Sequence, residues 1–412
     1  MSIVRVVIVN DASEARGGAT GLALLQARLL ADRGIETIFF GADRQPNDAL
    51  AVLGVRMVNA GSDPLMKAPV HRAAVRGLYN GQVRAALEGL IAEVDSPDTI
   101  YHVHSWSKTL TPSVFGALSR VASRTFLHAH DFFFVCPNGG FMDYQAMQPC
   151  ARVPLSLDCL STQCDKRNRA QKMWRVARQV ILSRMLPTDA PWAGIVMIHP
   201  AMSSFLRMRY PEELLLAVRN PAVGFTATRV EAERNRDFLF IGRVEAEKGV
   251  EELIAAATIA GVPLRVIGDG PLREPLAARY PDVRFTGWLD RDAIAEEVRT
   301  ARALVMPSRY PEPFGLVAAE ASLSGLPVIL SKSALLAREM EEKGLGFACD
   351  TRDPVAFAAA LTHVATLPAW ILAAMSALGA SGEAGLSKSP DDWIDALLAL
   401  YRQASRQLPA IG

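Results

Sequence analysis

The chain has 412 residues, and its 44 lysines and arginines nearly balance its 43 aspartates and glutamates, giving a formal net charge of +1. This balance lacks the basic excess of a nucleic-acid-binding protein, so we expect no nucleic-acid partner. Hydrophobic residues make up 50% of the chain. The length exceeds that of one hydrophobic core and predicts two domains of about 200 residues.

Cysteine content and the start of the chain bear on its location. Five cysteines do not form the even set of a secreted disulfide framework. Residues 1–5 lead directly into an apolar strand instead of a signal-peptide core. No uninterrupted apolar run reaches the roughly 18 residues that indicate a transmembrane helix. We therefore expect a cytoplasmic protein.

The first segments predict a βαβ unit. Residues 3–9 are expected to form a buried strand, residues 19–33 a helix rich in alanine and leucine, and residues 36–40 a second strand. The turn between them contains Gly17 and Gly18 but lacks the G-x-G-x-x-G spacing of a dinucleotide-binding fingerprint. From the residues alone, this turn is equally a simple helix entry.

Strands and helices continue to alternate: strand 55–58, helix 70–93, strand 99–104 and strand 124–130. His102 and His104 share a strand face, and we expect His102 to be a buried core residue. For His104 two interpretations are equally open: a core residue, or a residue that lines an acceptor cleft. The second is open because His104 ends its strand, and open α/β sheets bind ligands at the carboxyl ends of their strands. His130 and Asp131 end the next strand.

A long insert, residues 132–165, interrupts this pattern and contains four of the five cysteines: Cys136, Cys150, Cys159 and Cys164. Three interpretations remain open: a structural zinc bound by four thiolates, two disulfides, or four free thiols. The first is favoured, and disulfides are disfavoured in a reducing cytosol. The spacing lacks the paired C-x2-C of common zinc sites. Asn138, in the turn after Cys136, is expected to reach the acceptor cleft.

Residues 166–184 combine seven basic residues with apolar ones and no acidic residue, which predicts a basic amphipathic helix. The basic residues are Lys166, Arg167, Arg169, Lys172, Arg175, Arg178 and Arg184. Two interpretations are open: a solvated face, or peripheral contact with an anionic membrane surface, as suits an enzyme with a lipid-linked acceptor.

A domain boundary is predicted at Asn220-Pro221, because this dipeptide breaks regular structure and a segment with weak core pattern follows. Residues 1–219 would form an N-terminal acceptor-binding domain and residues 220–388 a C-terminal domain with the same strand-helix alternation. The final segment, 389–412, is expected to be helical.

A phosphate cradle is predicted early in the second domain. Gly242 and Arg243 follow a buried strand, and Lys248-Gly249 opens a helix shortly afterwards. Two cations and a helix N-terminus are therefore expected to converge on one anion.

The most informative stretch is residues 307–320, PSRYPEPFGLVAAE, which follows a buried apolar run. Glu312 and Glu320 stand eight positions apart in a strand-loop-helix layout. Pro313 is expected in the first helical turn, and Gly315 allows the backbone to approach a ligand closely. The backbone amides from Phe314 through Leu316 to Val317 would point toward an anion from the helix N-terminus.

This E-x7-E arrangement, together with EPFGLVAAEAxxxGxPVI, resembles the signature of retaining nucleotide-sugar glycosyltransferases of family 4. The resemblance implies the GT-B fold: two Rossmann-like parallel-sheet domains facing a cleft, with the C-terminal helix crossing back to the first domain. Many members of the family lack an insert like residues 132–165, so the resemblance leaves its role open.

The resemblance also assigns site residues. Glu312 would hold the sugar hydroxyls, Glu320 the ribose hydroxyls, and Arg243 and Lys248 the departing phosphate. Gly17 and Gly18 would lie beneath the donor diphosphate. His130 would touch the transferred sugar, with Asp131 as a neighbour that fixes its tautomer.

We therefore expect a retaining, hexosyltransferase-type enzyme that moves a sugar from a nucleotide-diphosphate sugar to a glycan or lipid-linked glycan in cell-surface polysaccharide synthesis. No catalytic metal or cofactor is expected, because two cations take the place of a D-x-D-bound metal. The alternatives are a nucleotide-sugar epimerase on the same fold and a non-catalytic nucleotide-sugar-binding assembly protein.

Overall fold

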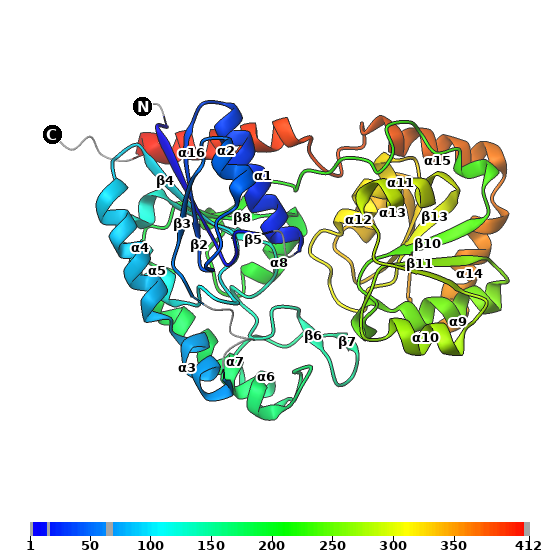
Figure 1. Ribbon diagram of the computed structural model, residues 1–412. Coiled ribbons are helices and arrows are strands. Elements are labelled where there is room, and N and C mark those ends of the chain that lie inside the picture. The colour runs from blue at the N-terminus through cyan, green and yellow to red at the C-terminus, as the bar shows by residue number, and fades with distance from the viewer. Residues whose placement is uncertain (1–2, 15–16, 63–68, 408–412) are drawn as a thin grey trace. The chain divides into compact units, whose positions relative to one another are not determined.

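The computed structural model describes residues 3–14, 17–62 and 69–407. The chain divides into two compact units (Figure 1). Unit 1 comprises residues 1–140, 151–218 and 390–412, and unit 2 comprises residues 141–150 and 219–389. The predicted boundary at 219/220 thus differs by one residue from the observed one. Residues 141–150, placed by the sequence in the N-terminal domain, group with unit 2 instead.

Unit 1 is built on a parallel sheet with seven strands in its described part, in the order β3-β2-β1-β4-β5-β8-β9. The strands are β1 (Arg5–Asn10), β2 (Glu36–Gly41), β3 (Arg56–Asn59), β4 (Thr99–Val103), β5 (Thr125–Ala129), β8 (Gly194–Met197) and β9 (Leu215–Ala217). The helices are α1 (Gly18–Asp32), α2 (Asp48–Val52), α3 (Val70–Leu78), α4 (Gly81–Val94), α5 (Ser113–Leu118), α6 (Leu157–Ser161), α7 (Arg169–Met185), α8 (Ser203–Leu206) and α16 (Pro390–Gln407).

Strand order in this sheet reverses between β1 and β4, which lie side by side although most of the first 100 residues separate them. In open α/β sheets, such a reversal opens a crevice at the carboxyl ends of the two strands. Asp11 follows β1 there, and its carboxylate accepts backbone hydrogen bonds from Lys108 (2.9 Å), Thr109 (2.7 Å) and Leu110 (2.8 Å) in the loop after β4. This buried carboxylate therefore fixes the loop that follows His104.

Unit 2 contains a second parallel sheet, with six strands in the order β12-β11-β10-β13-β14-β15. The strands are β10 (Asp237–Ile241), β11 (Leu264–Ile267), β12 (Arg284–Gly287), β13 (Ala301–Met306), β14 (Val328–Ser331) and β15 (Gly346–Cys349). The helices are α9 (Val250–Ala260), α10 (Arg273–Arg279), α11 (Arg291–Arg299), α12 (Leu316–Leu323), α13 (Ala337–Glu342), α14 (Pro354–Thr366) and α15 (Ala369–Ser381). A hairpin of β6 (Met142–Asp143) and β7 (Gln148–Pro149) also groups with this unit. Here the strand order reverses between β10 and β13.

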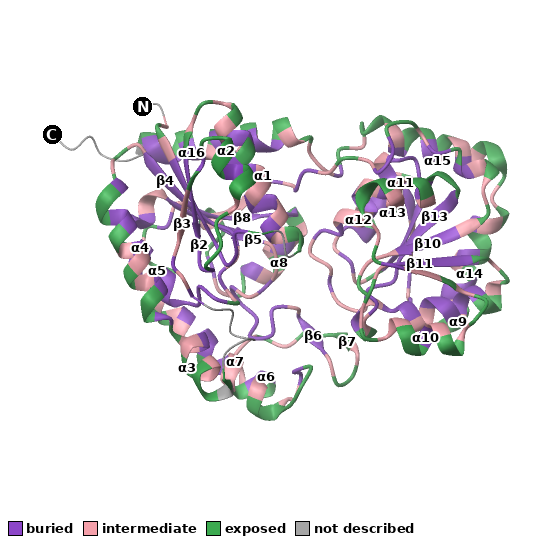
Figure 2. Cartoon of the chain, in the orientation of Figure 1, coloured by how far each residue is buried: buried purple, intermediate pink, exposed green. Residues whose placement is uncertain are grey.

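Burial explains why both sheets form. All five residues of β4 and all six of β13 are buried, as expected for strands covered by helices on both faces. Figure 2 shows buried strands and exposed outer faces on the surrounding helices. The prediction of two parallel α/β domains is confirmed.

The last helix, α16, belongs to unit 1, where it packs on α1. Its Trp393 and Tyr401 are fully buried, and Arg33 at the end of α1 bonds to Asp391 and Asp395. One expected element differs: the helix predicted over residues 70–93 is two helices, because Asn80 caps α4 by accepting from the Val83 amide.

Among the described residues, no single helix has the length and apolarity needed to cross a membrane. One bent pair, α14 and α15, passes only when the two helices are taken together, by length and composition.

Candidate active site

Two predicted site residues meet at the β10/β13 reversal in unit 2. Lys248 ends a short 3₁₀ helix (Ala246–Lys248) after β10, and Glu312 lies in the loop after β13. Lys248 Nζ is 2.9 Å from Glu312 Oε2 and 3.1 Å from Oε1. Each side chain is only 16% exposed, so the ion pair is largely withdrawn from water.

Two uncharged residues of the same loop complete this group. Ser308 Oγ donates to Glu312 Oε2 at 2.8 Å, and Lys248 Nζ donates to the Tyr310 hydroxyl at 2.7 Å. Both belong to the PSRYPEPFG stretch, but the sequence reasoning took only its carboxylates and backbone amides. A serine or tyrosine in a loop sequence does not by itself indicate a functional site, because most such hydroxyls only form local hydrogen bonds within turns.

The environment keeps this group charged. Burial alone raises the pKa of Glu312, but the nearby Lys248 and hydrogen bonds from Lys248, Ser308 and Tyr310 outweigh it and hold the pKa below its ordinary value. Burial raises the pKa of Tyr310 well above its ordinary value. At neutral pH the site therefore presents an ionised Glu312 and a neutral Tyr310 phenol beside Lys248.

The helix behind Glu312 begins later than expected. It starts at Leu316, so Pro313 and Phe314 precede it, and the prediction of Pro313 in the first helical turn is wrong. Gly315 caps the helix with a φ of 77°, and a Cβ there would lie 2.9 Å from Met306 Cε. Glycine is thus required for the sharp turn that aims the first amides of α12 out of the sheet edge.

Glu320 lies in the second turn of α12, the place that the sequence predicted. Its carboxylate pairs with Arg291 at 3.0 Å, and Arg291 also donates to the carbonyls of Val223 (2.7 Å) and Gly224 (2.9 Å). Burial raises the pKa of Glu320 against the lowering effect of Arg291. Arg291 starts α11, and nothing in its sequence context indicated this role.

Arg243 does not share an anion with Lys248 in this structure. Its side chain is 66% exposed and donates to Glu245 Oε1 at 2.7 Å, whereas Lys248 pairs with Glu312. The predicted convergence of the two cations is therefore not what the structure shows. Gly249 precedes α9, as predicted, and packs tightly against the loop after β13, since a Cβ there would lie 2.4 Å from the Pro307 carbonyl oxygen.

The predicted site residues of the N-terminal domain lie in unit 1. Gly17 has a φ of 127° and precedes α1, whose first residue is Gly18; both are exposed, and no side chain caps this helix. His130 follows β5 and is half-buried. With His104 and Asp131 it lines a cavity of about 20 Å³ at the carboxyl ends of β4 and β5.

Asp131 does not have the role expected of it. The ring of His130 bonds to His104 instead, with His130 Nε2 3.0 Å from His104 Nδ1. Asp131 Oδ1 accepts from the Phe133 amide at 2.9 Å, and burial raises the pKa of Asp131 to about 6. The tautomer of His130 is thus fixed through a second histidine.

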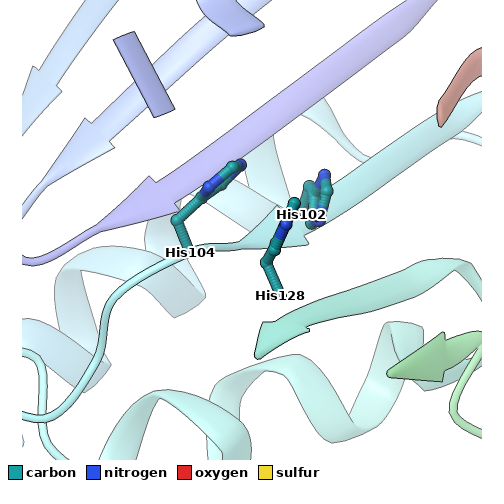
Figure 3. A group of neighbouring side chains, drawn as sticks. All are labelled: His102, His104 and His128. Carbon is teal, nitrogen blue, oxygen red and sulfur yellow. Dashed lines mark hydrogen bonds between the residues drawn. The ribbon is translucent and has the colours of Figure 1, made fainter. Parts of the chain in front are cut away.

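Four histidines gather on one face of β4 and β5: His102, His104, His128 and His130. Figure 3 shows the first three, whose nearest nitrogens lie within 4.8 Å of one another. The ring planes of His128 lie 16° from His102 and 27° from His104, with centroids 5.1 and 4.7 Å apart. His102 Nε2 and His128 Nδ1 are hydrogen-bonded to each other at 3.2 Å, and His104 Nε2 is bonded to Gln26, whereas a metal needs nitrogen lone pairs that converge on it at about 2.0–2.1 Å. This cluster therefore does not fit a metal ion.

The cysteine-rich insert brings Cys159 and Cys164 close to one ammonium. Lys172 of α7 is buried, and its Nζ is 2.9 Å from Cys164 Sγ and 3.6 Å from Cys159 Sγ.

The other predictions for the insert have different outcomes. Asn138 bonds to Cys136 and Cys164, so it stabilises the insert and does not reach the acceptor cleft, contrary to the prediction. No disulfide joins any two of the five cysteines, all of which the structure describes, and this contradicts the disulfide alternative. Cys150 lies in the segment that groups with unit 2. The four-thiolate zinc site stays a prediction.

The basic helix is less exposed than its sequence suggests. Lys172 points into the thiol pair, and Arg175 bonds to buried Asp165 at 2.7 Å. Arg178 is buried over the rings of Phe133 and Trp174. Lys166, Arg167, Arg169 and Arg184 remain exposed. Part of the basic face of residues 166–184 is thus covered by the protein itself, and peripheral membrane contact stays a prediction.

Comparison with known proteins places the Lys248–Glu312 pair inside a recognised domain. Residues 227–375 match the family described as "Glycosyl transferases group 1". Glycogen synthase of Mycobacterium tuberculosis H37Rv is 38% identical over 144 residues, 32% of this chain and 34% of that protein. D-inositol 3-phosphate glycosyltransferase of Streptomyces griseus is 30% identical over 205 residues, 44% of this chain and 43% of that protein. The chain thus matches between a third and a half of the length of these curated relatives.

Solved structures resemble the chain over nearly its full length. Sucrose-phosphate synthase from Thermosynechococcus elongatus aligns with a TM-score of 0.68 at 20% identity, covering 97% of this chain and 98% of that one. Anabaena Alr3699/HepE, solved in complex with UDP, aligns with a TM-score of 0.66 at 15% identity, covering 97% and 100%. At these identities the likeness concerns the fold alone. The predicted fold class, two Rossmann-like domains of GT-B type, is confirmed.

Proposed function

We propose that this protein is a retaining glycosyltransferase that moves a sugar from a nucleotide-diphosphate sugar to an acceptor hydroxyl. The observation that carries the proposal is the buried Lys248–Glu312 pair, which lies at the strand-order reversal of the unit matching glycosyl transferases group 1. Relatives named as glycosyltransferases and a fold neighbour solved with UDP support a nucleotide-sugar donor.

The proposed donor site uses unit 2. Glu312, kept ionised by Lys248, accepts hydrogen bonds from the sugar hydroxyls, and Glu320, held by Arg291, accepts from the ribose hydroxyls. Bond cleavage leaves negative charge on the diphosphate. Lys248, Arg243 and the amides at the start of α12 are the groups available to stabilise that charge. Arg243, exposed and bonded to the neighbouring Glu245, must change partner to do so.

Unit 1 supplies the remaining proposed contacts. Gly17 and Gly18 precede or open α1 without a side chain that could obstruct a diphosphate. His130 contacts the transferred sugar. We propose no covalent nucleophile and no catalytic metal: the acceptor attacks on the face that the diphosphate leaves, assisted by the departing phosphate, with cations supplied by the protein.

For the acceptor we propose a glycan or lipid-linked glycan of cell-surface polysaccharide synthesis, used on the cytoplasmic side of the membrane. The basic residues that remain exposed around α7, Lys166, Arg167, Arg169 and Arg184, would give only weak peripheral contact with anionic lipid.

A thermal-shift screen of nucleoside diphosphates and nucleotide sugars tests the donor. A ligand at about 100 times its Kd should stabilise the folded protein by about 2.7 kcal/mol. Lys248→Ala should lose most of this shift, whereas Arg338→Ala, which removes an exposed ion pair on α13, should keep it. If no nucleotide shifts the wild type, the donor class is wrong. Product analysis then separates the alternatives, because an epimerase acts without an acceptor and an assembly protein binds without turnover.

A further inference from the structure

The histidine cluster is a connected hydrogen-bond network, of which the proposed function uses His130 alone. It contains His102 of β4 and His104 just after it, and His128 of β5 and His130 just after it. Gln26 of α1, fully buried, bonds to two of the rings and to Tyr401 of α16. Residues far apart in the chain thus meet beneath the carboxyl ends of two neighbouring strands.

All four imidazoles are held neutral. Burial lowers the pKa of His102, His104 and His128 well below the ordinary value, and the neighbouring histidines lower it further. Burial lowers the pKa of His130 to about 3. A neutral imidazole carries one proton, so each hydrogen bond between two rings needs one donor and one acceptor nitrogen.

The arm toward His130 starts at the amide oxygen of Gln26. Gln26 Oε1 is 2.5 Å from His104 Nε2 and can only accept, so the proton of His104 is on Nε2. His104 Nδ1 is then bare and must accept from His130 Nε2, 3.0 Å away. The proton of His130 is therefore on Nε2, and its Nδ1 has a free lone pair.

The second arm starts at the amide nitrogen of Gln26. Gln26 Nε2 donates to the Tyr401 hydroxyl at 2.7 Å, and this hydroxyl donates in turn to His102 Nδ1 at 2.5 Å. His102 then carries its proton on Nε2 and donates to His128 Nδ1 at 3.2 Å. His128 is thus also protonated on Nε2, and that nitrogen has no partner among the described residues.

The opposite orientation of the Gln26 amide would invert every tautomer and leave His130 with a proton on Nδ1. The structure places the amide oxygen of Gln26 against His104 Nε2 and the amide nitrogen against the Tyr401 hydroxyl and His102 Nδ1, which is the orientation described. In the orientation described, the leftover N–H belongs to His128, which lines the 20 Å³ cavity, about the space of one water molecule. An N–H without an acceptor is costly when fully enclosed, and a cavity of this size gives the His128 N–H access to a water molecule.

We propose that Gln26 and Tyr401 are positioning residues that hold the four imidazoles in one concerted tautomer, so that His130 offers an unprotonated Nδ1 to a substrate hydroxyl. Gln26 sets the arm to His130 and Tyr401 the arm to His128. The tautomers follow from the hydrogen bonds of the network. The binding of a sugar hydroxyl by His130 rests, in addition, on the proposed function.

The tautomers are measured on the ligand-free protein labelled with ¹⁵N-histidine, through long-range ¹H–¹⁵N correlations that separate protonated from bare ring nitrogens. A His130→Gln variant identifies the His130 signals among the seven histidines. We expect His130 to show a bare Nδ1 and a protonated Nε2. A proton on His130 Nδ1 would overturn the proposal without any variant and without any known substrate.

Three variants test the two arms. Gln26→Met removes the acceptor of His104 and should give His130 a measurable Nδ1–H fraction. Gln26→Glu restores that acceptor and should restore the single tautomer. Tyr401→Phe is the matched control, because it alters the His102 arm and should leave His130 unchanged. If Gln26→Met folds and His130 keeps a single tautomer, Gln26 does not set it.

Kinetic measurements test whether the tautomer of His130 matters for sugar transfer. Gln26→Met should lower kcat about tenfold, the size of one lost hydrogen bond, while donor KM stays near the wild-type value and Gln26→Glu recovers most of the rate. An unchanged kcat in a variant whose His130 tautomer has become mixed would overturn the positioning role. Absence of transferase activity from the wild type would contradict the proposed function and leave the tautomer measurement intact.

Discussion

Lys248 Nζ lies 2.9 Å from Glu312 Oε2 within a largely buried group at the β10/β13 reversal. The two residues are 64 positions apart and follow neighbouring strands of one parallel sheet. Lys248 holds the pKa of Glu312 below its ordinary value in a site from which water is mostly withdrawn. The pair therefore affects both the stability of unit 2 and its proposed chemistry.

Replacing one residue of this pair should lower the free energy of unfolding more than replacing both. In Lys248→Met, only the hydrogen bonds from Ser308 and Tyr310 still oppose burial. We therefore expect the pKa of Glu312 to rise above its ordinary value and the variant to lose stability as pH rises from about 4 to 7. We expect Lys248→Met to cost about 3 kcal/mol at pH 7, and Lys248→Met/Glu312→Gln to recover part of it. Chemical denaturation at pH 4 and pH 7 checks both. Equal losses at the two pH values would contradict the coupling.

Substitution of Glu312 and of Glu320 should affect different kinetic constants. Ribose hydroxyls change little during transfer, so Glu320→Gln should raise the donor KM and leave kcat nearly unchanged. Glu312 is proposed to touch the sugar, where charge and geometry change, so Glu312→Gln should lower kcat. Steady-state kinetics with varied donor distinguishes them. The reverse pattern would mean that the donor lies the other way along α12.

The histidine network should make the protein sensitive to mild acid. Unfolding releases four histidines whose pKa is depressed in the folded state, so the unfolded chain binds protons first and stability falls as pH drops below about 6.5. Each such histidine contributes up to about 1.4 kcal/mol per pH unit, and Asp131, whose pKa is raised to about 6, opposes them with one proton.

Urea unfolding between pH 5 and 7 measures this slope. His128→Phe, which keeps a flat ring in the stack, should reduce it. His71→Phe is the control, because His71 is exposed on α3. A slope that is the same in wild type and His128→Phe would show that the network does not stay neutral.

The cysteine-rich insert should bind about one zinc per chain through Cys136, Cys150, Cys159 and Cys164. Elemental analysis of protein purified without chelator checks the stoichiometry. Cys159→Ser should lose the metal, and Cys349→Ser, which alters a buried thiol of β15 outside the insert, should retain it. A metal-free wild type would leave Lys172 as the partner of two free thiols.

Much of the fold and the charged part of the site could be predicted, because local patterns encode them. Apolar strands alternate with helices, and Glu312, Gly315 and Glu320 sit within one short motif. Gln26 and Tyr401 could not be found in this way. Tyr401 bonds to His102, which lies 299 positions earlier in the chain. The sequence around a helical glutamine or tyrosine does not show that its polar group is buried against such a distant residue.

Lys172 and Arg178 illustrate a different limit. A basic residue in an amphipathic helix is normally expected to face solvent, yet both side chains lie buried, one against thiols and the other over aromatic rings. Helical periodicity gives the face on which a residue lies, but it does not show which loop covers that face. Here the insert covers it, and the insert has no regular pattern to predict.

The most direct test of the proposed chemistry is the anomer released when the enzyme slowly hydrolyses a nucleotide α-sugar in place of transferring it, followed by NMR. This measurement needs no knowledge of the acceptor. A retaining enzyme using the Lys248–Glu312 site releases the α-sugar first, and Lys248→Ala slows that release by roughly 10²- to 10³-fold. Release of the β-sugar first, or the same rate in Lys248→Ala, would contradict the account.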